Sequence, residues 1–194
     1  MNYNEVLNFW FNQLTPKDWS TPNEQLDLKM VEKFIVIHSE AINGELSVWR
    51  NSSHGRLAEI LLIDQFSRTI YRDDPKAYAS DALALALAQE LIAANMHIDF
   101  DVAQKQFLYM PFMNSESKSI HSIAVKLFSE TGLEHSLKNE LASQKIINRF
   151  ERYPERNKIL GRQNTAEEEA YLKNKIANEQ SESLLGLNTS SIFL

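Results

Sequence analysis

The apolar residues of this chain recur with a helical period along almost its whole length. Between residues 57 and 66 they occupy nearly every position around a helix, which predicts a central element enclosed by other helices. No stretch alternates apolar and polar residues in the way that a half-buried strand requires. The pattern therefore predicts an all-helical chain.

Start and stop signals divide the chain into about eight helices joined by short loops. Capping boxes begin at Thr21 and Thr165, and Asn43 with Gly44 supplies a left-handed stop. We expect one helical domain over residues 1–177 and a C-terminal tail over 178–194, either loose or docked by its last apolar residues. A stack of antiparallel helical hairpins and an irregular bundle both fit this division. The predicted helices span residues 5–13, 22–43, 56–72, 76–94, 101–109, 115–129, 136–152 and 165–177.

The charge of the chain limits its partners. The 194 residues carry a formal charge of −6 and have a pI near 5.4, which argues against non-specific attraction to nucleic acid or anionic lipid. Residues 1–11 show no secretory signal, and no apolar run approaches the roughly 20 residues of a membrane-spanning helix. We therefore expect a cytoplasmic protein that does not contact a membrane.

Motifs of several reaction classes are missing from the sequence. There is no cysteine, which excludes disulfides, thiolate metal sites and cysteine nucleophiles. The five glycines are too dispersed to form a phosphate-binding loop or a dinucleotide fingerprint. No histidine has a glutamate three residues before it or a second histidine four residues away, as di-iron bundles and zincin helices require. We therefore expect no metal and no cofactor.

Charged residues interrupt the otherwise apolar central helix. Asp64 falls on its apolar stripe, and Arg68 and Arg72 follow one and two turns later. An unpaired ion in such a place would cost several kcal/mol, so we expect Asp64 to pair with Arg68. Asp81, in the next predicted helix, is a candidate partner for Arg72.

A second cluster of arginines lies between residues 145 and 162. It contains Arg149, Arg152, Arg156 and Arg162, so six of the eight arginines of an acidic protein fall in two short stretches. Guanidinium forks that converge in a partly dry groove match a carboxylate or a phosphate. The two clusters together therefore predict an anion site.

Tyr109 is the aromatic residue that we retain as a candidate for the same site. The helix before it is expected to stop at Pro111, and Asn114 or Ser115 is expected to open the next helix. Free N–H groups at such a helix start, beside a phenol, would suit an anion.

The clustered arginines have three interpretations. Nearby carboxylates can neutralise them as an internal salt-bridge network that fixes the register of the helices. Alternatively, the forks form a pocket for a small anion, a peptide carboxylate or a phosphorylated partner. The third interpretation is a nucleic-acid site, which the local excess of six Lys and Arg over two Glu between residues 145 and 162 favours. The negative charge of the whole chain opposes it, so we do not expect nucleic acid as a partner.

Three blocks of the sequence resemble a bacterial family catalogued as domain of unknown function 924. The resemblance covers residues 6–172 and implies an all-helical fold similar to tetratricopeptide repeats, a stack of antiparallel helical hairpins, with no established activity. Where that family usually has His, Gly and His, this chain has Asn114, Glu151 and Glu155, which favours binding or structure over catalysis. The three blocks span residues 61–72 continued by 77–81, 107–116, and 149–157 with 160–162.

Three functional hypotheses follow. The first is a binding module whose arginine-rich groove takes an anionic peptide or small molecule. The second is an enzyme in which Tyr109, Glu116 or Asp64 transfers a proton while the arginines stabilise negative charge. The third is a scaffold for another protein, which would present a large exposed apolar patch. The first hypothesis assigns ligand binding to Asp64, Arg68, Arg72, Asp81, Tyr109, Arg149, Arg152 and Arg156.

Overall fold

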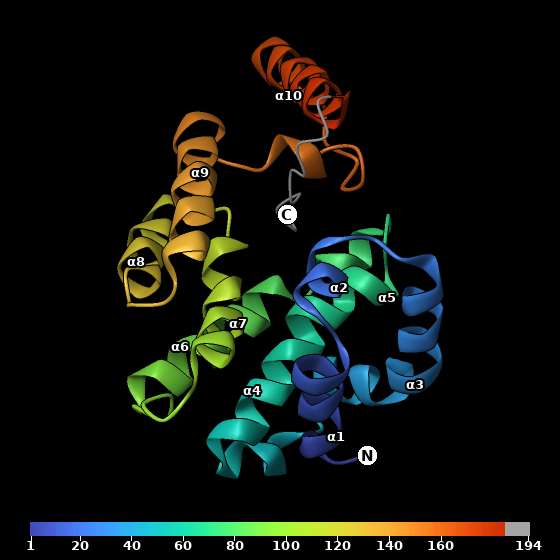
Figure 1. Ribbon diagram of the computed structural model, residues 1–194, viewed down its shortest axis with the longest axis vertical. Helices are drawn as coiled ribbons and strands as arrows, with labels where there is room; N and C mark the ends of the chain where they lie inside the picture. The colour runs from blue at the N-terminus through green and yellow to red at the C-terminus, as the bar shows by residue number, and fades with distance from the viewer. Residues whose placement is uncertain (185–194) are drawn as a thin grey trace.

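The computed structural model describes residues 1–184, and this part of the chain is all-helical and contains no strand (Figure 1). The prediction of an all-helical fold is thereby confirmed. Between the α-helices lie two π-helical turns, η1 (Phe9–Gln13) and η3 (Leu62–Phe66), and three short 3₁₀ turns, η2 (Ser47–Asn51), η4 (Pro75–Ala77) and η5 (Pro154–Arg156). The α-helices are α1 (Tyr3–Asn8), α2 (Pro16–Ser20), α3 (Glu24–Ile42), α4 (Ser53–Leu61), α5 (Ser67–Ile70), α6 (Asp81–Ala93), α7 (Val102–Met113), α8 (Lys118–Phe128), α9 (Glu134–Phe150) and α10 (Ala166–Leu184).

A continuous central helix is formed by α4, η3 (Leu62–Phe66) and α5. Every side chain from 57 to 68 is buried, as the run of apolar residues predicts. α1, α3, α6 and α7 pack around this helix and supply the enclosing surface. The π-helical turn η3 inserts one extra residue into the helix, and Asp64 and Gln65, both buried, lie within it.

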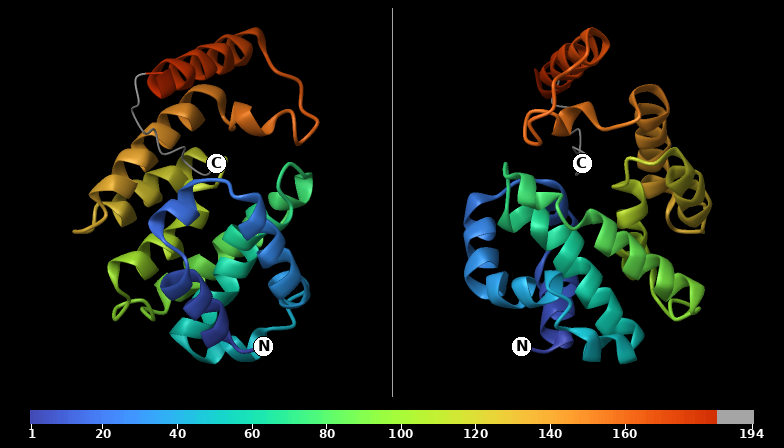
Figure 2. Two further views of the ribbon diagram at one scale, coloured as in Figure 1. Left: turned by 45° about the vertical axis from the view of Figure 1, so that its right-hand side comes forward. Right: turned by 180° about the vertical axis from the view of Figure 1, so that it is seen from behind.

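The helices α6, α7, α8 and α9 follow one another in space as they do in sequence, and each packs against the next (Figure 2). This arrangement is compatible with the predicted stack of antiparallel hairpins. α10 lies at one end of the molecule, beyond α9 and the 3₁₀ turn η5 (Pro154–Arg156).

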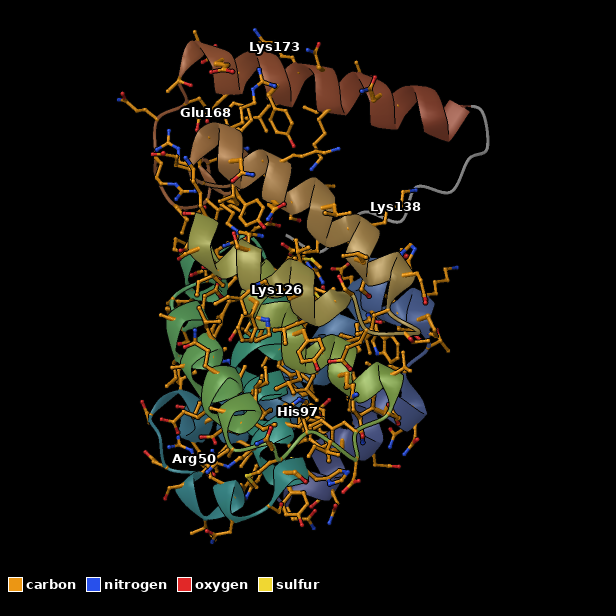
Figure 3. The ribbon with its side chains drawn as sticks, turned by 90° about the vertical axis from the view of Figure 1, so that its left-hand side faces the viewer. Arg50, His97, Lys126, Lys138, Glu168 and Lys173 are labelled. Carbon is orange, nitrogen blue, oxygen red and sulfur yellow. The ribbon has the colours of Figure 1, made fainter. Side chains whose placement is uncertain are left out.

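α10 is held mainly by polar contacts. Glu168 lies on the side of α10 that faces the rest of the protein, whereas Lys173 lies on the outer side (Figure 3). The capping box predicted at Thr165 is confirmed, because Thr165 N donates to Glu168 Oε2 at 2.7 Å and Glu168 N donates to Thr165 Oγ1 at 3.2 Å. The one predicted at Thr21 was wrong, because Asn23 is the residue that caps α3.

Several predicted boundaries were wrong. The predicted helix over 76–94 begins only at Asp81, because the Asp74 cap serves a short 3₁₀ turn, η4 (Pro75–Ala77). Pro111 does not end α7, since it lies in the last turn, where it removes a single helical N–H donor. α10 runs on to Leu184, past the predicted start of the tail, and the rest of that tail, residues 185–194, lies outside the described residues.

The described residues contain neither a membrane-spanning helix nor a cluster of metal-ligating side chains. No helix there is long and apolar enough to cross a membrane. Within the same residues, no group of three or more His, Asp and Glu side chains is placed to hold a metal ion.

Candidate functional site

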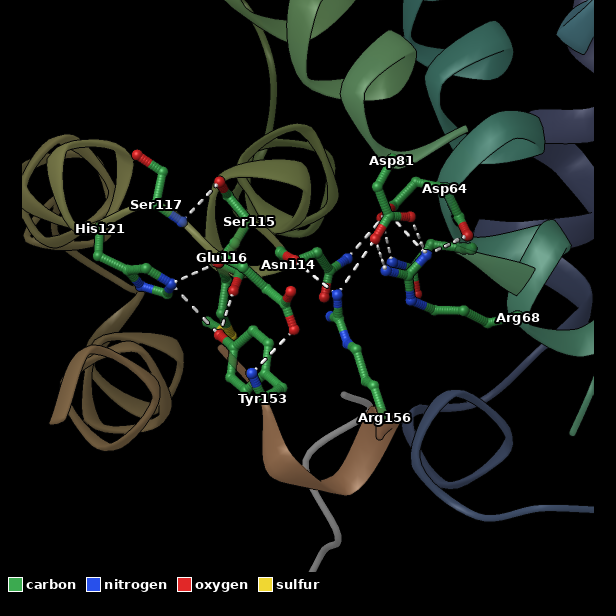
Figure 4. A network of polar contacts seen from close by, with 12 residues as sticks. Asp64, Arg68, Asp81, Asn114, Ser115, Glu116, Ser117, His121, Tyr153 and Arg156 are labelled. Carbon is green, nitrogen blue, oxygen red and sulfur yellow. Dashed lines mark hydrogen bonds and ion pairs between the residues drawn. The ribbon is translucent and has the colours of Figure 1, made fainter. Parts of the chain in front are cut away.

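A buried cluster of polar side chains lies where the central helix meets α6, α7 and η5 (Figure 4). The π-helical turn η3 supplies Asp64, which is fully buried. Asn114 Nδ2 donates to Asp64 Oδ1 at 2.8 Å, and Gln65 Nε2 donates to Asp64 Oδ2. Arg68 Nη1 lies 3.1 Å from Asp64 Oδ1, which confirms the predicted pair one turn apart.

Asp81, the first residue of α6, joins two arginines. Arg68 Nη1 and Nη2 donate to its two carboxylate oxygens at 3.1 and 3.0 Å. Arg156 Nη1, from η5, donates to Asp81 Oδ2 at 3.3 Å and to the main-chain oxygen of Asn114 at 3.0 Å. Asp81 therefore connects the central helix to Arg156, which lies 75 residues after Asp81 in the chain. The prediction that Asp81 pairs with Arg72 was wrong.

The guanidinium of Arg156 is the most unusual group in this cluster. Only 3% of the residue is exposed, and its guanidinium carbon lies 4.8 Å from the ring centre of Tyr78 and 4.5 Å from that of Tyr153. Its Nε and Nη2 atoms are buried and have no hydrogen-bond partner among the described residues. The edge of the guanidinium formed by Nε and Nη2 therefore has no acceptor in this part of the chain, and we call it the open edge of Arg156.

Burial and charge shift the pKa values of these groups. Burial lowers the pKa of Arg156, and the neighbouring charge of Arg68 lowers it further. Burial opposes the charged form of Arg68 as well, yet Asp64 and Asp81 together raise the pKa of Arg68. Burial also raises the pKa of Asp81, aided by Asp64 and opposed by the two guanidiniums. With both aspartates and both arginines ionised, the four charges sum to zero.

A second buried polar set lies beside the first and was not predicted as a unit. His121 Nδ1 lies 2.7 Å from Glu140 Oε1, and His121 Nε2 donates to the main-chain oxygen of Ser115 at 2.8 Å. Burial raises the pKa of Glu140, whereas the hydrogen bond with His121 opposes that rise. Tyr153 donates its hydroxyl to the main-chain oxygen of Met113 and so connects this set to the Arg156 region.

Glu116 fixes the segment that carries Arg156. Arg162 Nη1 and Nη2 donate to its two oxygens at 2.6 and 2.9 Å, and Tyr153 N donates to Glu116 Oε1 at 2.8 Å. Although burial opposes it, these hydrogen bonds hold the pKa of Glu116 below its usual range. Glu116 is consequently an ionised anchor for η5.

Two of the other predicted arginines have their forks filled by carboxylates of the protein itself. Arg72 Nε and Nη2 donate to the two oxygens of Asp27 at 2.6 and 2.9 Å. Arg152 Nε and Nη2 donate in the same way to Glu168 at 2.6 and 2.8 Å. The expectation that these two arginines meet a ligand in a groove shared with Arg156 is therefore not supported by their contacts.

Arg149 and Tyr109 also have partners outside the buried cluster. Arg149 Nε donates to Glu167 on α10 at 2.7 Å, and both side chains are exposed. Tyr109 donates its hydroxyl to Glu130 at 2.6 Å, and burial, aided by this contact, raises the pKa of Tyr109. The predicted helix start beside Tyr109 was wrong, because α7 continues through Pro111.

Of the eight predicted site residues, four meet in one place. The structure brings together Asp64, Arg68, Asp81 and Arg156. Sequence reasoning missed Asn114 and Tyr78 as members of this cluster. Both lie inside the sequence blocks that carry the family resemblance, and Asn114 was also singled out as a departure from the family and as a possible helix start.

The fold and this buried charge cluster define an all-helical protein, and comparison with known proteins identifies its family. The sequence matches the family described as bacterial protein of unknown function, domain 924, over residues 6–175. The chain therefore belongs to that family. A solved structure of a protein of unknown function from Agrobacterium tumefaciens is similar, with a TM-score of 0.84, 30% sequence identity, and coverage of 89% of this chain and 97% of that one. No curated protein matches the chain.

Proposed function

We propose that this protein is a binding module that takes a small anion on the open edge of the Arg156 guanidinium. The observation that carries the proposal is the pair of buried, unpartnered nitrogens, Nε and Nη2, on a residue that is 3% exposed. Leaving buried donors unpaired costs free energy, more so on a charged group. An anion on this edge would remove that cost.

Three other arginines of this protein show what such an edge holds. In Arg50, Arg72 and Arg152, Nε and Nη2 donate side by side to the two oxygens of one carboxylate, with all six distances between 2.6 and 2.9 Å. This bidentate geometry is the one in which arginine recognises carboxylates and phosphates most strongly. Arg156 presents the same edge without a carboxylate of the protein on it.

The surroundings of Arg156 hold its fork ready for a ligand. Asp81 and the main-chain oxygen of Asn114 fix Nη1, and the rings of Tyr78 and Tyr153 lie close to its guanidinium. A side chain restrained in this way loses little further conformational entropy when a ligand binds. Since both open nitrogens are buried, entry of the anion requires local movement of the segments around η5.

Binding fits these residues better than proton transfer does. The pKa of Glu116 is lowered by its hydrogen bonds, and the pKa of Tyr109 is raised by burial, so both move away from neutral pH. General acid–base catalysts need a pKa near the working pH. The enzyme hypothesis therefore loses two of its three candidate groups.

The proposal can be tested with ¹⁵N-labelled protein at low ionic strength. We expect one arginine Nε–H signal, assigned to Arg156 by its loss in Arg156→Lys, to shift on titration with members of a panel of phosphate, sulfate, acetate and glycolate. Arg72→Lys is the matched control, because the fork of Arg72 is already occupied by Asp27. The control variant should retain the response. The absence of any shift in the wild-type protein at tens of millimolar of each anion would overturn the proposal.

A further inference from the structure

Resting on this proposed function, we infer that the anion at Arg156 is a small carboxylate that carries a hydroxyl or amino group on the adjacent carbon. Three observations carry the inference: the donors that the edge offers, the charge that surrounds it, and one buried acceptor on a neighbouring residue.

The first observation concerns the shape of the anion. Nε and Nη2 lie in one plane and match the two oxygens of a carboxylate, as they do in Arg72 and Arg152. The polar atoms that already contact the fork, Asp81 Oδ2 and the main-chain oxygen of Asn114, are both acceptors. These acceptors occupy Nη1, so Nε and Nη2 remain as two donors for the two oxygens of a carboxylate, whereas a phosphate has further oxygens that two donors cannot serve. The contacts of the fork therefore favour a carboxylate.

The second observation concerns charge. Arg68 and Arg156 balance Asp64 and Asp81, and the nearby Arg162 balances Glu116. A ligand therefore enters a buried region that is already neutral. The free-energy cost of burying an ion rises steeply with the number of charges that it carries. An anion with one negative charge, or a zwitterion with no net charge, is therefore favoured over a phosphate dianion.

The third observation is an acceptor without a donor. Asn114 Oδ1 is buried and has no hydrogen-bond partner within residues 1–184. Its orientation is fixed, because Asn114 Nδ2 donates to Asp64 Oδ1 at 2.8 Å and a carboxylate oxygen accepts this bond. The main-chain oxygen of the same residue accepts from Arg156 Nη1 at 3.0 Å. The residue that carries the unpaired acceptor therefore also contacts the guanidinium of Arg156. A hydroxyl or amino group next to the carboxylate would supply the missing donor.

The test is a comparison of four small molecules on the wild-type protein: glycolate, glycine, acetate and inorganic phosphate. The affinity of each is measured from the Arg156 Nε–H signal at one pH and low ionic strength. We expect glycolate, glycine or both to bind roughly fivefold more tightly than acetate, since one additional hydrogen bond contributes about 1 kcal/mol. Phosphate should bind more weakly than either. In Asn114→Leu, the preference over acetate should disappear while acetate still binds.

The outcomes separate this inference from the proposed function. Acetate binding as tightly as glycolate and glycine, or phosphate binding more tightly than all three, overturns the inference and leaves anion binding at Arg156 intact. Binding of none of the four molecules overturns both. The comparison of ligands on the wild-type protein decides the matter even where the Asn114 variant fails to fold.

Discussion

Asn114 donates its side-chain amide to the carboxylate of Asp64 at 2.8 Å, across 50 residues of sequence and with both side chains buried. Replacing Asn114 with Ala should lower the free energy of unfolding by about 1–3 kcal/mol, because a buried carboxylate loses one of its donors. Urea denaturation followed by circular dichroism measures the change. Asn12→Ala, which removes an exposed amide, is the control and should change stability by less than about 0.5 kcal/mol. Equal effects of the two variants would contradict the prediction.

Asp81 should be far more important for stability than Asp27, although each carboxylate accepts a bidentate arginine. Asp81→Asn removes the charge that faces both Arg68 and Arg156, which are almost fully buried, and should cost about 3–5 kcal/mol. Asp27→Asn affects Arg72, whose side chain is 31% exposed, and should cost about 1 kcal/mol or less. Denaturant unfolding of the two variants tests the contrast, and a cost for Asp27→Asn that equals or exceeds that of Asp81→Asn would refute it.

Acid should destabilise the protein through His38. Burial lowers the pKa of this residue from 6.5 to about 4. Ser67 donates its hydroxyl to the main-chain oxygen of Ile63, so His38 Nε2 must donate to Ser67 Oγ, at 2.8 Å. Below pH 6.5 the unfolded chain binds a proton at His38, whereas the folded protein binds this proton only near pH 4. Stability is therefore unaffected above about pH 7.5 and falls as the pH drops toward 4, by about 3 kcal/mol in total.

The measurement for His38 is the free energy of unfolding as a function of pH, compared with His38→Gln. Other groups titrate in the same range, so the difference between the two proteins isolates the histidine. The variant should be less stable at pH 7.5 and should lose less stability on acidification. Parallel pH curves for the two proteins would show that His38 does not titrate in this way.

Glu151 ends α9 with a left-handed backbone, at a φ of 61°. This conformation strains a residue with a Cβ atom and suits glycine. Glu151→Gly should therefore raise the midpoint of thermal unfolding by about 2–4 °C. Glu151→Ala keeps the strain and loses the exposed pair with Lys118, so it should lie at or below the wild-type midpoint. Calorimetry of the three proteins gives the order, and a glycine variant that melts below the alanine variant would disprove the explanation.

α10 should loosen at high ionic strength. Its ion pairs with the rest of the protein, Arg149 with Glu167, Arg152 with Glu168 and Lys175 with Glu155, include partners that remain in contact with solvent. Amide hydrogen exchange should therefore accelerate in α10 between low salt and molar salt. The buried helix α4 serves as the internal reference and should keep its protection. Uniform exchange across both helices at all salt concentrations would contradict this expectation.

Contacts that depend on local spacing could be predicted from the sequence, whereas contacts that depend on topology could not. The pair of Asp64 and Arg68 follows from one helical turn, and the complete burial of the central helix follows from its apolar residues. The partner of Arg72 is Asp27, 45 residues earlier on α3, and no local pattern indicates it. The same holds for Arg156, whose partner Asp81 lies 75 residues away.

Two helix boundaries were predicted wrongly because a local stop or start signal did not mark the end or the beginning of the α-helix. Pro111 usually marks a stop, yet it is tolerated in the last turn of α7, where the surrounding side chains are buried. Asp74 and Pro75 have the pattern of a helix start, but the turn that they cap is short and the α-helix begins at Asp81.

The π-helical turn at residues 62–66 sets the phase between the two halves of the central helix. If these five residues wound as a plain α-helix, each would turn by about 100°, more than in the wider π-helical turn, and everything after the segment would be rotated relative to everything before it. Ser67 would then turn away from His38, and Arg68 from Asp81, while the packing of α4 stayed in place. The wider turn is consequently what allows α4 to keep its packing while the residues after the turn reach His38 and Asp81.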